Sequence, residues 1–185
     1  MDRVIAKYER ILTYAWTMWP ITRPLSPGQF IPVFNGDLMI NGIHHACFTV
    51  SNLERSIAFY RDKLGMEVLW DSAEARVSYK GPISDKITGC VGTEQHIVYL
   101  GIGGDFLELV EYTPPGKALL NNLASDVGAA HVCFKTDNIN ELYERLIADN
   151  GVVHCRPQKG VSNLVIYFRD PDGIILEAIE GKTKV

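Results

Sequence analysis

Hydrophobic and polar residues follow the same pattern in two separate stretches of the chain. In residues 42–65 apolar side chains recur first at every second position, as in a strand, and then at every third or fourth position, as in a helix. Residues 128–151 repeat this order, and the two stretches align without a gap, so that His45 is equivalent to His131. The pattern therefore predicts a strand, a turn and a helix, present twice.

The alternation divides each first strand into two faces. The residues predicted to pack on the first helix are His44, Ala46, Phe48 and Val50. His45 lies on the opposite face together with Cys47, and the repeat places His131 and Cys133 in the same way. Both histidines are therefore expected on a sheet face that is turned away from the helix of their own repeat.

Polar residues and glycines mark the predicted ends of the two helices. Ser51 is followed three residues later by Glu54, the spacing of a capping box, so we expect Ser51 to cap the first helix. Asp137 is the corresponding prediction for the second helix. Glycine ends both helical patterns, at Gly65 and at Gly151.

A second repeated pattern follows each of these stretches. It reads GDFLELVE at residues 104–111 and GIILEAIE at residues 173–180, and alternation places Glu108 and Glu177 between apolar residues on a strand. Such a carboxylate is costly to bury unless it is paired or bound to a cation. Each repeat thus offers one histidine on its first strand and one glutamate on its last, and we expect the four side chains to converge on one site.

The remaining elements complete two similar modules. Further strands are predicted at residues 66–73, 96–102, 152–155 and 164–168. Residues 76–95 contain glycine and proline without periodicity and are predicted to be a loop insertion. The segment RDPDG, residues 169–173, is predicted to be the turn into the last strand.

The repeat defines the domain organisation. Residues 41–185 are predicted to form a single domain of two modules, 41–112 and 128–185, with a linker at 113–127. Residues 1–40 form an N-terminal extension, in which the spacing of apolar residues predicts a short helix before a Pro-rich segment. We expect this helix to pack on its own domain or on a dimer partner, and a lid over the active site is the alternative. Its apolar run is too short to span a bilayer.

Composition limits the possible partners. The chain has 185 residues, of which 46% are hydrophobic, enough for one globular core. A net charge of −4 without a basic cluster argues against nucleic acid or a membrane surface as the partner and favours a small molecule. The four cysteines form no C-x-x-C pair, which predicts free thiols in a reducing, cytoplasmic compartment.

Residues 43–180 resemble the vicinal oxygen chelate superfamily, which includes glyoxalase I, methylmalonyl-CoA epimerase, extradiol dioxygenases and bleomycin or fosfomycin resistance proteins. The resemblance rests on HHACFTVSNLERSIAFY, FLELVEY, AAHVCFKTDNI and DPDGIILEAIE, in this order. It implies an α+β fold in which two β-α-β-β-β modules in tandem form a cupped mixed sheet around a metal site, here with an N-terminal extension. It also implies a homodimer.

The resemblance further implies the metal ligands. Its four ligand positions are occupied here by His45, Glu108, His131 and Glu177. Imidazole and carboxylate together suit one divalent ion of nickel, cobalt, zinc, manganese or iron, and an octahedral shell keeps two positions for oxygens of substrate or water. Any one of these residues alone would be read as an ordinary core or surface side chain, but all four at repeat-equivalent positions favour the metal site.

The first functional hypothesis is a metal-dependent isomerase or epimerase, of glyoxalase or epimerase type, acting on a small carbonyl substrate. It would remove a proton next to the carbonyl through a metal-stabilised enolate, with Glu177 as the base and Glu108 as a second one. One alternative is an iron(II) extradiol-type dioxygenase, for which a fourth protein ligand at Glu108 would crowd the open positions. The other is a metal-free small-molecule binding or resistance protein.

Several other side chains are weaker candidates. Contact with substrate is a minor possibility for His44, His96 and His154. Cys47 and Cys133 are predicted to be small core residues rather than nucleophiles. Glu111 and Glu180 alternate away from the cup and are predicted to be surface or helix-facing charges.

Overall fold

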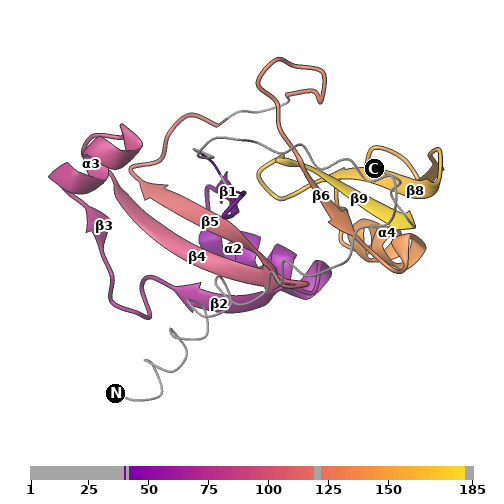
Figure 1. Cartoon of the computed structure of the whole chain (residues 1–185), viewed down its shortest axis with the longest axis horizontal. Helices are drawn as coiled ribbons and strands as arrows, with labels where there is room; N and C mark the ends of the chain where they lie inside the picture. Colours follow the sequence, from indigo (N-terminus) through magenta and orange to yellow (C-terminus); the bar gives the residue numbers. More distant parts are fainter. Residues whose placement is uncertain (1–39, 41, 119–121, 182–185) are drawn as a thin grey trace, which may run out of the picture. The chain divides into compact units, whose positions relative to one another are not determined.

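Two β-sheets, one from each repeat, form the framework of the described part of the chain (Figure 1). The computed structural model describes residues 40, 42–118 and 122–181. The helix and the Pro-rich segment predicted within residues 1–40 lie outside the described residues, apart from Ile40. From Ile43 onward the chain forms one compact unit.

The first sheet has the strand order β1-β5-β4-β2, with the short strand β3 paired to β4. Strand β1 runs parallel to β5, and the other pairs are antiparallel. The strands are β1 (Ala46–Thr49), β2 (Glu67–Asp71), β3 (Tyr79–Lys80), β4 (Glu94–Ile102) and β5 (Asp105–Thr113).

The second sheet has the same plan, with the strand order β6-β9-β8-β7 and a parallel pair of β6 and β9. Its strands are β6 (Val132–Lys135), β7 (Gln158–Lys159), β8 (Asn163–Arg169) and β9 (Ile175–Gly181). Residues 152–155, predicted as a strand, form only one isolated bridge, between Val153 and Phe168. The α+β class and the two tandem modules are confirmed, and within the described residues each module has its own hydrogen-bonded sheet.

A helix follows the first strand of each module, as the pattern predicts. Helix α2 (Leu53–Ala58) continues into the π-helix η1 (Phe59–Lys63), and α4 (Ile139–Ala148) is its counterpart. Among the described helices, none has the length and apolar character needed to cross a bilayer.

The predicted N-caps are wrong by one residue. Asn52 caps α2 by accepting a hydrogen bond from the backbone N–H of Arg55, and Asn138 caps α4 by accepting one from that of Glu141. Each asparagine oxygen reaches the N–H three residues ahead, which is the geometry of an N-cap. The Ser51 hydroxyl instead contacts Asp172 in the other module.

The insertion of residues 76–95 contains a helix that the sequence reading missed. Helix α3 (Pro82–Thr88) begins with proline at its first turn and ends at Gly89, whose φ of +73° lies in the left-handed region. None of its residues is buried, and its apolar face consists of the exposed pair Ile83 and Ile87, which is too short to produce a recognisable hydrophobic periodicity. The prediction of an irregular loop was therefore wrong.

The core lies between each sheet and its helix and continues from one module to the other. Its best-buried members are Tyr60, Val98, Leu100, Leu109, Ile139, Ile166, Phe168 and Leu176. Burial of each large apolar side chain contributes about 1.5–3 kcal/mol. Every second residue of β1 and β6 faces away from this core, and Cys47 and Cys133, which belong to this set, are exposed.

The turn between β8 and β9 ties the second module to the first helix. The buried Tyr60 hydroxyl donates to Asp170 Oδ2 at 3.1 Å, and burial raises the pKa of Asp170. Asp172 accepts hydrogen bonds from the backbone and hydroxyl of Ser51, at 3.0 and 2.5 Å, and from Arg55 at 2.7 Å. These helix and turn side chains therefore join the modules in addition to the shared apolar core.

Candidate metal centre

His45 and Glu108 lie together on the open face of the first sheet. His45 directly precedes β1, and Glu108 lies on the neighbouring strand β5, in register with Cys47. The Nε2 atom of His45 is 3.8 Å from Oε1 of Glu108. Only 13% of the glutamate side chain is exposed, so this carboxylate is largely withdrawn from water next to a potential metal-binding imidazole.

His131 and Glu177 form the equivalent pair on the second sheet. Glu177 lies on β9, in register with Cys133 on the adjacent strand β6. His131 Nε2 is 3.0 Å from Glu177 Oε2, and the glutamate side chain is 16% exposed. The repeat thus builds two half-sites, each with one imidazole and one carboxylate: the first half-site contains His45 and Glu108, and the second contains His131 and Glu177.

Each half-site also contains a tyrosine that the sequence reading missed. Tyr99 on β4 is in register with Glu108, and Tyr167 on β8 is in register with Glu177. The Tyr167 hydroxyl donates to Glu177 Oε2 at 3.1 Å and lies 3.4 Å from His131 Nε2. The signal was the repetition of a tyrosine between apolar residues on the strand that precedes each glutamate strand.

Burial and the glutamates perturb the tyrosine hydroxyls. In both half-sites burial raises the pKa of the tyrosine, and the hydrogen bond to the glutamate raises it further. Tyr99 and Tyr167 are therefore neutral hydrogen-bond donors at physiological pH. A donor fixed on a ligand carboxylate holds that carboxylate in one orientation.

The half-site cysteines are exposed, so the prediction that they are core residues was wrong. Burial of the sulfur by neighbouring atoms, followed by the hydrogen bond to Glu108, raises the pKa of Cys47 to about 12. For Cys133 burial and the charge of Glu177 raise the pKa to about 11. Both side chains are therefore thiols near neutral pH, and neither is an activated nucleophile.

Two of the three weaker histidine candidates lie beside a half-site. His44 lies next to His45, with 2.7 Å between their Nδ1 atoms, and the His154 ring stacks on that of Tyr167 at a centroid distance of 6.1 Å. His96, in contrast, hydrogen-bonds Asp71 at 2.7 Å from the opposite face of β4. Its position excludes it from the first half-site.

Glu111 and Glu180 face the helices, as predicted. Glu111 Oε2 accepts the backbone N–H of Leu53 at 2.7 Å, and Glu180 Oε2 accepts that of Ile139 at 2.7 Å. A carboxylate at a helix N-terminus satisfies a free backbone donor and complements the helix dipole. These two glutamates therefore position the helices and take no part in the half-sites.

The two half-sites do not meet within one chain. In the part of the chain that the structure describes, no three histidine, cysteine, aspartate or glutamate side chains lie close enough to hold a metal ion together. A single copy thus does not bring the four predicted ligands into one site.

The donor set nevertheless fits a divalent ion. Each half-site supplies one nitrogen and one oxygen donor, and the combination of imidazole and carboxylate suits borderline divalent metals. A cavity of about 70 Å³ lined by Leu64, Phe134 and Leu142 lies on the helix side, where it offers no such donors. The half-sites are therefore the candidate metal centre.

Two modules of one plan, each with a histidine directly before its first strand and a glutamate on its last, define the class of protein. The model of the Glyoxalase/Bleomycin resistance protein/Dioxygenase superfamily matches residues 42–178. The chain belongs to this superfamily, which confirms the resemblance to vicinal oxygen chelate proteins.

Its relatives include enzymes of two kinds. Lactoylglutathione lyase of Salmonella typhimurium is 29% identical over 141 residues, 75% of this chain and 91% of the relative. Metallothiol transferase FosB of Shouchella clausii is 27% identical over 154 residues, 77% of this chain and 82% of the relative.

Solved structures show the same fold. A glyoxalase family protein from Bacillus cereus aligns with a TM-score of 0.67 and 19% identity, over 81% of this chain and 99% of that one. A mutant of the fosfomycin resistance protein FosX from Listeria monocytogenes, in a complex with Mn(II) and 1S,2S-dihydroxypropylphosphonic acid, aligns with a TM-score of 0.56 and 20% identity, over 79% of this chain and 94% of that one.

Proposed function

We propose that the protein is a metal-dependent enzyme of isomerase or epimerase type that acts on a small carbonyl compound. The observation that carries the proposal is the repeated half-site, a histidine and a largely buried glutamate on equivalent strands of two modules. The divalent metal of the FosX complex and the lyase activity named for the Salmonella relative agree with it.

The complete centre is proposed to form between two copies of the chain. Each copy has two half-sites on open faces, and no group of three ligand-type side chains gathers among its described residues. In a symmetric dimer the first half-site of one copy can face the second half-site of the other, and the two-fold axis generates two equal centres. His45, Glu108, His131 and Glu177 would then hold one divalent ion in each centre.

The proposed reaction is the transfer of a proton next to a carbonyl. The ion, when bound, supplies a Lewis acid that stabilises negative charge on the substrate oxygen. Glu177 accepts the proton at its carboxylate, while the Tyr167 hydroxyl, 3.1 Å from Oε2, holds the group in place. Glu108, whose hydrogen bond with Tyr99 helps to raise the pKa of that tyrosine, serves the opposite face of the substrate when both faces exchange.

Metal analysis and isotope exchange test the proposal together. The purified protein should contain about one divalent ion per chain, since each copy contributes one first and one second half-site. In D₂O it should introduce deuterium next to the carbonyl of at least one compound among 2-keto acids, hydroxyketones and acyl thioesters, and chelation should stop the exchange.

Two other outcomes would replace the proposal. Oxygen consumption with an iron-loaded protein, and no isotope exchange, would establish the dioxygenase alternative. Tight binding of a small molecule by a protein that retains no metal after incubation with nickel, cobalt, zinc, manganese and iron would establish a binding or resistance protein.

A further inference from the structure

Both half-sites contain a histidine, a glutamate and a tyrosine at equivalent positions, but the residues that flank them differ. Trp70 lies in register with Tyr99 in the first module, whereas His154 stacks on Tyr167 in the second. Two residues before the glutamate, Phe106 in the first module corresponds to Ile175 in the second. Features common to both modules serve the metal, so the differences between them are the place to look for substrate selectivity.

In the first module, aromatic side chains at these positions form a row of rings that begins at His45, a proposed metal ligand. The His45 ring is stacked on Phe106 at a centroid distance of 6.2 Å, and Phe106 meets Tyr99 edge to face at 5.5 Å. Trp70 follows at 5.5 Å from Tyr99, and Tyr79 at 6.4 Å from Trp70.

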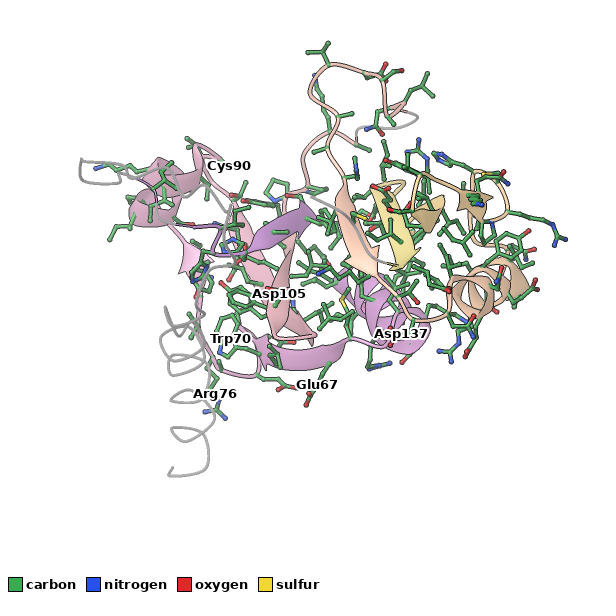
Figure 2. All side chains as sticks on the ribbon, turned by 45° about the vertical axis from the view of Figure 1, so that its right-hand side comes forward. Glu67, Trp70, Arg76, Cys90, Asp105 and Asp137 are labelled. Carbon is green, nitrogen blue, oxygen red and sulfur yellow. The ribbon has the colours of Figure 1, made fainter. Side chains whose placement is uncertain are left out.

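We define Trp70, Tyr79, Tyr99 and Phe106 as the aromatic wall. Strand register places Trp70, Tyr99 and Glu108 on one face of the sheet, and Figure 2 shows the Trp70 side chain on β2. All four rings of the wall are partly exposed, so they present ring surface next to the first half-site without being closed into the core.

The second half-site has no comparable wall among its described residues. Within the described part of the chain, its ring contacts are those of Tyr167 with His131 and His154, and Ile175 is 1% exposed. Beside its histidines the second half-site therefore offers a single phenol ring, whereas the first offers an indole, a phenyl and two phenol rings.

We infer that the substrate carries a flat apolar group, aromatic or conjugated, which packs on the aromatic wall while its oxygens reach the metal centre. The inference rests on the proposed function, because the wall is continuous with a proposed ligand, His45. Rings that meet offset or edge to face gain affinity beyond the burial of their area, and for one bound ring this amounts to roughly tenfold.

A pair of chelators that differ by one ring provides the test. Acetohydroxamate and benzohydroxamate both bind metals through two neighbouring oxygens, and only the second carries a phenyl ring. Calorimetric titration of nickel-loaded protein should show benzohydroxamate binding roughly tenfold more tightly. Trp70→Ala should remove most of this preference and change acetohydroxamate affinity much less, while Trp70→Phe should keep it.

His154→Ala, at the equivalent position of the second module, is the matched control and should leave the preference intact. Should Trp70→Ala fail to fold, Phe106→Leu tests the same wall. Equal affinity for the two chelators in the nickel-loaded protein, or a preference that survives removal of the wall rings, would overturn the inference.

The metal-free protein separates this inference from the proposed function. Saturation-transfer NMR should detect contact between the benzohydroxamate ring and the wall without metal, and Trp70→Ala should abolish it. Ring contact in a protein that never retains metal would overturn the proposed function and leave the wall as a binding surface. Full metal binding without any preference for the ring would overturn the inference about the wall and leave the proposed function in place.

Discussion

Complementation between two inactive variants should reveal whether the metal centre forms between copies of the chain. One variant, His45→Ala with Glu108→Ala, lacks the first half-site, and the other, His131→Ala with Glu177→Ala, lacks the second. All four side chains are on open sheet faces, away from the apolar core, so both variants should fold. Alone, each variant has only two ligands per centre and should lose stoichiometric metal.

The expected recovery follows from the symmetry. In a mixed dimer one centre combines both damaged half-sites and the other combines both intact ones. Random mixing yields about half mixed dimers, each with one working centre of two, so metal content and activity should recover to about one quarter of the wild-type value. A centre built within one chain predicts no recovery, because every chain in the mixture is damaged.

The assay is metal content after the two variants are unfolded, mixed and refolded together. Native mass spectrometry with one variant isotopically labelled must show that mixed dimers have formed. Mixed dimers that hold no metal would refute the intermolecular centre, and so would either double variant holding a full complement by itself. Each variant refolded alone is the control.

Three further predictions follow from individual contacts. Tyr167→Phe removes the hydroxyl that holds Glu177, so metal affinity measured by competition with a chelator should fall about 10- to 100-fold. Glu177→Gln should retain most of the metal but slow deuterium exchange by about 10²- to 10⁴-fold, and near-normal exchange would show that the base is elsewhere. Burial opposes ionisation of Asp172, but hydrogen bonds from Ser51 and Arg55 lower its pKa from the ordinary value of 3.8. The ionised carboxylate therefore stabilises the fold above that pH, and this stabilisation is lost as the pH falls through the lowered pKa. Asp172→Asn should therefore cost about 1 kcal/mol in urea unfolding at pH 7, because Arg55 is half exposed, and nothing in strong acid.

The sequence predicted the modules because their periodicity is a direct consequence of burial on one face. In β1 the core contacts alternate, and the same holds in β6, so Cys47 and Cys133 could be assigned to the open face without a structure. The repeat placed one histidine and one glutamate in each module, and the structure shows them as two pairs, His45 with Glu108 and His131 with Glu177, whereas the predicted convergence of all four is not seen among the described residues of one copy. An element without buried residues has no such periodicity, so the sequence does not predict α3, which has no buried residue.

The tyrosines were missed for a different reason. Tyr99 and Tyr167 become equivalent only when each is counted from its own glutamate across a hairpin, which requires the strand register. Along the sequence each is one aromatic residue in an apolar strand, a pattern typical of core packing. Register therefore adds a third member to each half-site that spacing alone does not identify.

What periodicity could not decide is which two half-sites face each other. Alternation assigns a side chain to one face of its own sheet, but it does not determine how two sheets are oriented, and one copy or two copies of the chain satisfy the repeat equally well. The modules are joined by a shared apolar core and by polar contacts of Asp170 with Tyr60 and of Asp172 with Ser51 and Arg55. In the sequence these residues belong to an ordinary turn and an ordinary helix start. No three ligand-type side chains gather among the described residues of one copy, and we therefore propose that a second copy supplies the other half of each centre, as a two-fold axis allows.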